Sequence, residues 1–325
     1  MREQGPGPAH GPGRRPRPGV PRVAVETPSV FRRVPWGLVV VRGPDARGFL
    51  QSIVSQDLDP VPEGATVASL LLQPQGKLSV AFRATRHRAG PASGAAPDAA
   101  AAAVEEWWCD TEPEVAERLA AGLVRFRIRV QVEVDDRTAS TGAATVVGTE
   151  PGLLPDGLVA LPAAWGDGPG VDVVGPAAAV DAWIADRGLP VGDAATFEAV
   201  RIAAGVPRHG IDIDESTIPQ EAFLERDAVS FTKGCFIGQE LVCRIDSRGH
   251  VNRFLRRLEL TGTTAPGPGA TVHADGTVVG AVTSAAVVPG TTRVVALAMV
   301  RREVEPPASV TVDDGSGPAP ARVVA

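Results

Sequence analysis

Residues 233–240, Lys-Gly-Cys-Phe-Ile-Gly-Gln-Glu, place a thiol, a cation and a carboxylate within eight positions that include two glycines. Gly234 and Gly238 would let the backbone turn tightly and approach a ligand closely. The apolar spacing that begins at Gln239 predicts a helix that stops near Gly249. The segment therefore reads as a glycine-rich turn that leads into a helix.

Cys235 would lie just before the N-terminus of this helix. The positive end of the helix dipole and the nearby Lys233 would both favour the thiolate, which makes Cys235 a candidate reactive cysteine. The alternative is a small buried side chain in a tight turn. Glu240 would be favourable in the first helical turn, where it could pair with Arg244 one turn later; alternatively it would pair with Lys233 or position a ligand amine. Because a lysine and a glutamate are costly to bury unpaired, the grouping favours a functional site over a core.

The segment resembles the signature of the YgfZ family of folate-binding proteins, which are related to the glycine-cleavage T-protein (GcvT). The likeness covers roughly residues 30–305. Besides residues 233–240, it includes 201–207 with 218–221, the stretch from Trp36 to Asp57, and 276–284. The resemblance gives Cys235 and Lys233 the catalytic roles, and its remaining signature residues are Gly234, Phe236, Gly238, Gln239 and Glu240.

The resemblance implies tetrahydrofolate as cofactor and an accessory role in the assembly or repair of iron–sulfur proteins and in tRNA modification. Its folate-contacting aromatic positions fall on Trp36 and Phe197, although both rings could equally be core residues. Asp57 is a further candidate, with a helix-terminating turn as its alternative. Arg125 heads a predicted arginine row that could hold the carboxylates of a folate tail, or face solvent.

The rival function is a folate-dependent aminomethyltransferase or demethylase. T-proteins use carboxylates at two places that this chain fills with Ser79 and Ala203. Asp57 or Glu198 would have to substitute for them. Cys235, at a position where T-proteins typically lack a cysteine, also favours the accessory protein over the enzyme. A third reading is a structural module of an assembly complex whose folate site is vestigial.

Composition restricts the remaining possibilities. The chain has 325 residues, 44% of them apolar, which predicts more than one globular domain. Three cysteines without a Cys-x-x-Cys pair give neither a disulfide framework nor a metal site. No apolar run is long enough to cross a bilayer, so a cytoplasmic protein without membrane contact is expected. A net charge of −6 argues against direct nucleic-acid binding, and folate and iron–sulfur client proteins are the expected partners.

The expected fold is α+β and GcvT-like, with mixed α/β portions around a central site and a C-terminal antiparallel β-barrel. Three parts are predicted: a disordered Gly/Pro/Arg-rich tail at 1–27, a folate-binding domain at 28–250 with a flexible insertion at 88–103, and the barrel at 251–325. Strands are expected at 38–41, 66–73, 77–85, 106–109 and 126–134, and helices at 113–124, 177–186 and 194–204. His209 and His250 are expected at exposed loop positions.

Overall fold

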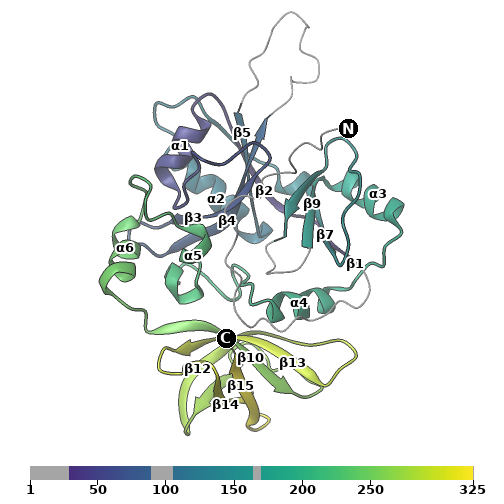
Figure 1. The fold of residues 1–325 in the computed structure, drawn as a ribbon, viewed down its shortest axis with the longest axis vertical. Helices are drawn as coiled ribbons and strands as arrows, with labels where there is room; N and C mark the ends of the chain where they lie inside the picture. The colour runs from purple at the N-terminus through teal and green to yellow at the C-terminus, as the bar shows by residue number, and fades with distance from the viewer. Residues whose placement is uncertain (1–28, 89–104, 164–169, 325) are drawn as a thin grey trace, which may run out of the picture.

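The structure is a computed structural model that describes residues 29–88, 105–163 and 170–324. Two antiparallel sheets with their helices lie side by side, and a closed barrel lies beneath them (Figure 1). This arrangement confirms the predicted α+β fold class with a C-terminal antiparallel barrel. The tail predicted at 1–27 and the insertion predicted at 88–103, apart from Arg88, lie outside the described residues.

The first sheet has the strand order β3-β4-β5-β2-β6, and all neighbours are antiparallel. Its strands are β2 (Gly37–Arg42), β3 (Thr66–Leu72), β4 (Leu78–Arg88), β5 (Glu105–Thr111) and β6 (Glu133–Asp136). Helices α1 (Ala46–Ile53) and α2 (Pro113–Arg125) cover one face, where Leu71 and Val80 join their apolar side chains. Because strand residues alternate between faces, Leu70 and Leu72 point to the opposite face and join a second core.

The second sheet has the order β1-β7-β9-β8. Its strands are β1 (Ser29–Arg33), β7 (Thr141–Val147), β8 (Val159–Pro162) and β9 (Gly170–Pro176), with η1 (Thr138–Ser140) before β7 and α3 (Ala177–Arg187) packed on β7 and β9. Helix α4 (Ala194–Ala203) follows, and the side chain of Asp193 caps its N-terminus by accepting a hydrogen bond from the Thr196 N–H. Strand β1 has no counterpart among the predicted strands.

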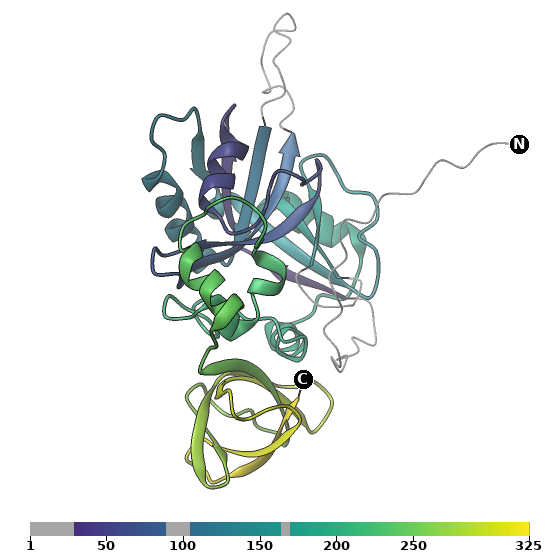
Figure 2. The same cartoon turned by 60° about the vertical axis from the view of Figure 1, so that its left-hand side comes forward.

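The barrel closes in the order β10-β13-β12-β11-β14-β15, and β10 also pairs with β15 (Figure 2). Its strands are β10 (Arg253–Thr261), β11 (Thr271–Ala274), β12 (Thr277–Val287), β13 (Arg293–Arg301), β14 (Ala308–Asp313) and β15 (Ala319–Val324). The segment before it contains η2 (Pro219–Ala222), α5 (Glu225–Ala228) and α6 (Gln239–Arg248). Helix α4 packs against β12 and β13, so one apolar core joins the first sheet, these helices and the barrel.

The strand predicted at 126–134 is wrong. Helix α2 continues to Arg125, the chain then turns, and Arg129 adopts a left-handed backbone with φ of 57°. The alternation of arginines with apolar residues suggested a half-buried strand, but no layer covers the apolar side, since Ile128 is 72% exposed. Only residues 133–136 pair with β2. Arg125 therefore does not head an arginine row on a sheet.

Candidate functional site

Trp36 and Phe197, predicted from different parts of the chain, meet the same arginine. Arg33 ends β1, and the Cζ of its guanidinium lies 4.0 Å from the ring centroid of Trp36 and 5.2 Å from that of Phe197. We call these three residues the aromatic cluster. Trp36 is buried against the second sheet, and its indole N–H has no hydrogen-bond partner among the described residues. A buried donor without a partner is costly, which makes it a candidate ligand contact.

Buried charges hold Arg33 in place. Asp172 on β9 accepts a hydrogen bond from Arg33 at 2.6 Å, from Arg83 at 2.7 Å and from the hydroxyl of Thr145 at 2.7 Å. Burial alone would raise the pKa of Asp172, but the two guanidinium groups outweigh it, and the pKa lies below its ordinary value. The Nε of Arg83 also donates a hydrogen bond to Oδ2 of Asp110 at 2.9 Å. Because Asp110 belongs to β5 of the first sheet and Asp172 to β9 of the second, Arg83 connects the two sheets.

Asp110 differs from Asp172 in the direction of its pKa shift. Burial raises the pKa of Asp110 above its ordinary value even though the Arg83 guanidinium opposes the shift. Its second oxygen, Oδ1, has no partner among the residues described. The aromatic cluster is therefore accompanied by one buried donor and one buried acceptor that the protein leaves unpaired.

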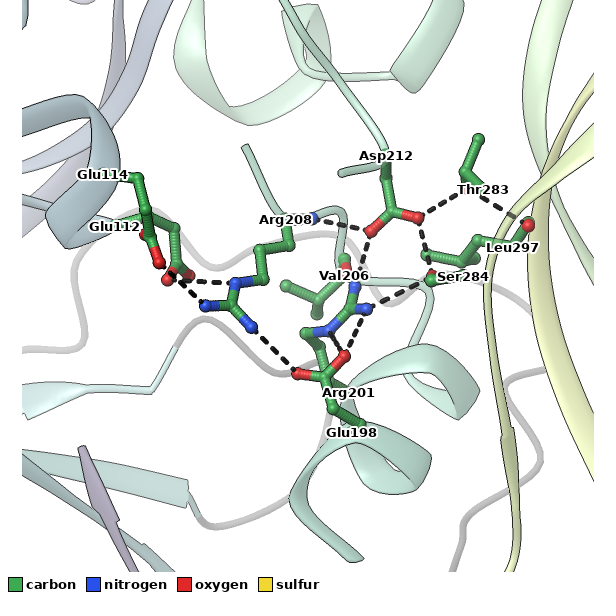
Figure 3. Close-up of polar contacts among 10 residues, drawn as sticks. All are labelled: Glu112, Glu114, Glu198, Arg201, Val206, Arg208, Asp212, Thr283, Ser284 and Leu297. Carbon is green, nitrogen blue, oxygen red and sulfur yellow. Dashed lines mark hydrogen bonds and ion pairs between the residues drawn. The ribbon is translucent and has the colours of Figure 1, made fainter. Parts of the chain in front are cut away.

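A group of carboxylates surrounds Arg208, and we call it the carboxylate cluster (Figure 3). The Arg208 guanidinium lies 3.4 Å from Glu112, 3.3 Å from Glu114 and 3.6 Å from Glu198. Glu112 and Glu114 come from the start of α2, and Glu198 comes from α4. Burial raises the pKa of Glu112, while Arg33 and Arg208 oppose the shift. Glu112 is thus within electrostatic reach of both the aromatic cluster and Arg208.

The Asp212 junction connects this region to the barrel (Figure 3). Asp212 Oδ2 accepts hydrogen bonds from the Arg201 guanidinium at 2.7 Å and the Arg208 backbone N–H at 2.9 Å. Its Oδ1 accepts from the hydroxyls of Thr283 at 2.5 Å and Ser284 at 2.6 Å. The pairing of β12 with β13 shifts register between Val282 and Ser284, and this bulge lets two successive hydroxyls reach one carboxylate.

The ion pair between Lys233 and Glu240, one of the alternatives considered from the sequence, does not form, because Glu240 pairs with Arg244. The Lys233 ammonium donates to the backbone carbonyls of Gln51 at 2.7 Å, Val54 at 2.6 Å and Gln56 at 3.1 Å, and thereby binds the C-terminal end of α1. Burial lowers the pKa of Lys233 to about 8, with Asp57 opposing the shift. Lys233 therefore fastens the signature segment to α1.

The other signature residues divide between packing and exposure. Phe236 is buried in the core that joins the first sheet to the barrel. Gly238 precedes α6 with φ of 76°, and a Cβ there would overlap the carbonyl oxygen of Gln73. Glu240 is exposed and pairs with Arg244 at 2.5 Å, and Gln239 opens α6. Phe236 and Gly238 thus fix the segment, whereas the side chain of Glu240 faces solvent.

Cys235 is exposed, and a Cβ at the neighbouring Gly234 would meet open space. The thiol lies four positions before α6 begins at Gln239, so it precedes the helix N-terminus without being its cap. Among the described residues, no group of three or more His, Cys, Asp or Glu side chains could hold a metal ion.

Asp57 and Arg125 lie away from the aromatic cluster. Asp57 accepts a hydrogen bond from Gln51 at 2.8 Å in the turn after α1, on the side of Lys233. Arg125 is exposed at the last turn of α2, and its Cζ lies 5.9 Å from the ring centroid of Phe126. The structure therefore brings Trp36 and Phe197 together, and places Asp57 with Lys233 in a second location.

The expectation that His209 is exposed is wrong, because its side chain is only 5% exposed. Neither ring nitrogen has a partner among the described residues. The loop after α4 folds back on itself at this histidine, with the Gly210 N–H donating to the carbonyl of Ile213. His250, in contrast, is exposed as expected.

Sequence reasoning missed Arg33, Arg208 and Glu112. Their partners come from distant segments, so no local spacing marks them. One usable signal was Arg201, which lies in the helix singled out by resemblance and is buried with Glu198 and Asp212 as partners.

Comparison with known proteins bears on these features. Residues 253–325, the barrel, match the family model of the glycine cleavage T-protein C-terminal barrel domain. The chain resembles the crystal structure of the glycine cleavage system aminomethyltransferase T from Bartonella henselae, with a TM-score of 0.75 over 92% of this chain and 85% of that one, at 19% identity. The fold is therefore T-protein-like over 92% of the chain.

The sequence relatives align with smaller parts of the chain. An uncharacterized protein of Haemophilus influenzae is 24% identical over 219 residues, which is 66% of this chain and 67% of that protein. Aminomethyltransferases of Nostoc sp. and Staphylococcus carnosus are 37% and 32% identical over 39% and 33% of this chain. The alignments span only 34% and 29% of those two enzymes, respectively. No helix among the described residues is long and apolar enough to cross a membrane.

Proposed function

We propose that this protein binds tetrahydrofolate, with its ring system at the aromatic cluster. The observation that carries the proposal is the meeting of Trp36 and Phe197 on Arg33 within a T-protein-like fold. A flat heterocycle needs a stacking surface and unpaired polar atoms at its edge. The indole N–H of Trp36 and Oδ1 of Asp110 supply an unpaired donor and acceptor there, so the residues present fit such a group.

Arg33 determines how a ring would bind. Its guanidinium covers one face of the Trp36 indole, so a bound ring either displaces the guanidinium or stacks on it. Arginine guanidinium groups stack on flat ring systems, and Arg33 remains anchored by Asp172 in either case.

We further propose an accessory role in iron–sulfur protein assembly or repair and in tRNA modification, in which Cys235 acts as the thiol. Ser79 and Ala203 cannot supply the carboxylates that the T-protein resemblance would require. Cys235 is exposed, so a protein client could approach its thiol. One thiolate cannot hold a cluster by itself, so Cys235 would complete a ligand set with a partner or act as a nucleophile.

The second candidate is an aminomethyltransferase. It is favoured by the similarity to the two named aminomethyltransferases and by the T-protein-like fold. Turnover of a methylamine donor with tetrahydrofolate would distinguish it from an accessory protein. Because fold similarity does not transfer activity, this assay decides between the two.

Folate binding is tested by anaerobic calorimetric titration with tetrahydrofolate. The Trp36→Phe variant keeps a ring but loses the indole N–H, and Phe197→Ala removes the second ring. Trp183→Phe is the matched control, since Trp183 is also buried with an unpartnered indole N–H but lies in α3. Weaker binding in the first two variants alone supports the proposal. Absence of binding by the unaltered protein overturns it.

The thiol is tested in a strain that lacks this protein, by measuring the activity of iron–sulfur enzymes. Cys235→Ser should fail to restore activity, whereas Cys243→Ser, which alters the half-buried cysteine of α6, should restore it. Full restoration by Cys235→Ser would remove the thiol from the mechanism.

A further inference from the structure

We propose that Glu112 and Glu198 bind the amino-substituted edge of the pterin ring and replace the carboxylates absent at Ser79 and Ala203. The inference rests on the proposed folate binding and adds the residues that would recognise the ring. Neither glutamate belongs to the signature segment at residues 233–240.

The chemistry of that edge defines what must recognise it. A pterin carries a ring N–H beside an exocyclic amino group, so it presents two parallel N–H donors. An arginine guanidinium presents the same pair, and a carboxylate accepts both in a fork-like arrangement. Groups of carboxylates that surround an arginine are therefore chemically suited to this edge of a pterin.

Glu112 lies next to the first ring of the aromatic cluster. It follows Thr111, which pairs with Gly37 in the first sheet, and Gly37 directly follows Trp36. A Cβ at Gly37 would lie 2.9 Å from the carbonyl oxygen of Glu112, so the two backbones are in contact. The glycine thus permits Glu112 to approach the start of β2. The electrostatic influence of Arg33 on Glu112 is consistent with this closeness.

Glu198 directly follows Phe197 in α4, and its side chain faces Arg201 and Arg208. Its Oε2 accepts hydrogen bonds from Arg201 at 3.0 and 2.7 Å, which fixes the carboxylate. Its Oε1 has no hydrogen-bond partner among the described residues and only the longer 3.6 Å contact to Arg208. One oxygen is therefore held in place while the other retains the capacity to accept a hydrogen bond.

Arg208 occupies the position between these acceptors. Its contacts of 3.3 to 3.6 Å are longer than the roughly 2.7–2.9 Å of a well-formed charge-assisted hydrogen bond. The three carboxylates thus share one guanidinium, and none of them forms a short hydrogen bond to Arg208. A pterin edge with the same donor pattern can take over the hydrogen bonds to Glu112 and Glu198, while Glu114 remains with Arg208.

The Asp212 junction keeps Glu198 in position. Arg201 binds Glu198 and Asp212 at once, and its Nη2 also donates to the Ser284 hydroxyl at 3.2 Å. The barrel therefore contributes to the orientation of Glu198 without contacting the aromatic cluster itself. Figure 3 shows this chain of contacts from Glu112 to the barrel strand.

The test is calorimetric titration of Glu112→Gln, Glu198→Gln and Glu114→Gln with tetrahydrofolate and with a tetrahydropterin that lacks the benzoyl-glutamate tail. Glu114→Gln is the matched control, because Glu114 contacts the same arginine but is 60% exposed. Because a hydrogen bond to a charged acceptor is lost, the first two variants should bind both ligands at least about tenfold more weakly than the unaltered protein. Glu114→Gln should bind like the unaltered protein. Thermal unfolding of each variant confirms that it is folded.

The outcomes separate the two proposals. If the unaltered protein binds neither ligand, the proposed folate function fails and this inference fails with it. If it binds both and Glu112→Gln and Glu198→Gln bind equally well, folate binding stands and the inference is overturned. Equal weakening in all three variants also overturns it, because that result would reflect the charge around Arg208. If Glu112→Gln and Glu198→Gln also bind the tail-less tetrahydropterin more weakly, while Glu114→Gln does not, the result supports recognition of the ring edge.

Discussion

Acidification should destabilise this protein through His209. Burial is the largest cause that lowers the pKa of His209 from 6.5 to about 4; Arg118 on α2 adds to the shift and Asp214 opposes it. The folded pKa lies below the unfolded one, so between these values the unfolded chain binds a proton that the native protein does not. Stability due to His209 is therefore complete above about pH 6.5 and decreases as the pH falls toward 4.

The magnitude follows from the two pKa values. Proton linkage gives a loss in the free energy of unfolding of about 2 kcal/mol at about pH 5 and about 3 kcal/mol at about pH 4. Little of the side chain is exposed, so solvent screening reduces this value only slightly. Neither ring nitrogen has a partner among the described residues that would stabilise the charged form.

The assay is urea unfolding of the unaltered protein, His209→Phe and His250→Gln at about pH 7, 6 and 5. The Phe variant cannot take up the proton, so its stability should fall by about 2 kcal/mol less than that of the unaltered protein over this range. His250→Gln alters an exposed histidine and should follow the unaltered protein. Parallel loss of stability in the unaltered protein and His209→Phe, or an NMR titration of His209 near its ordinary pKa, would refute the reasoning.

Three further substitutions test the contacts that fix the site. Gly238→Ala should lower the free energy of unfolding by about 2 kcal/mol or more, because φ is 76° and the new Cβ would overlap a neighbouring carbonyl; Gly234→Ala, which meets open space, should be nearly neutral. Lys233→Met should lower the free energy of unfolding by about 2–4 kcal/mol, because it leaves three backbone carbonyls without their donor. Lys77→Met, at an exposed lysine, should change it little. Ser284→Ala should cost about 1–3 kcal/mol because the buried carboxylate of the Asp212 junction loses a donor. Urea unfolding measures the free energy of unfolding of every variant. Equal losses in Gly238→Ala and Gly234→Ala would contradict the first prediction, and equal losses in Lys233→Met and Lys77→Met would contradict the second.

Elements with a strong hydrophobic period could be predicted from the sequence. Strand β2 has a continuous buried run, and α2 places its buried apolar residues on one face. The stretch after α2 was mispredicted because alternation alone does not show whether another layer covers the apolar side, and Ile128 is exposed. Periodicity therefore predicts an element only where tertiary packing uses it.

The candidate site was predicted less completely, because ion networks are properties of the fold. Trp36 and Phe197 were identified by resemblance, but Arg33, which contacts both, had no sequence signal. Lys233 was read as a partner of the thiol, whereas three backbone carbonyls from the end of α1 bind it. Backbone acceptors at a helix terminus cannot be seen as a motif, so the sequence could not distinguish this role.

The two parts of the proposed function occupy different structural settings. Phe236, next to Cys235, packs in the core that joins the first sheet to the barrel, whereas Trp36 packs in a separate apolar cluster on the second sheet. Lys233 and Gly238 fix the segment around the exposed thiol to α1 and to the hairpin after β3. The thiol is thus supported independently of the aromatic cluster. If both proposals hold, folate binding and thiol chemistry use separately supported parts of one fold.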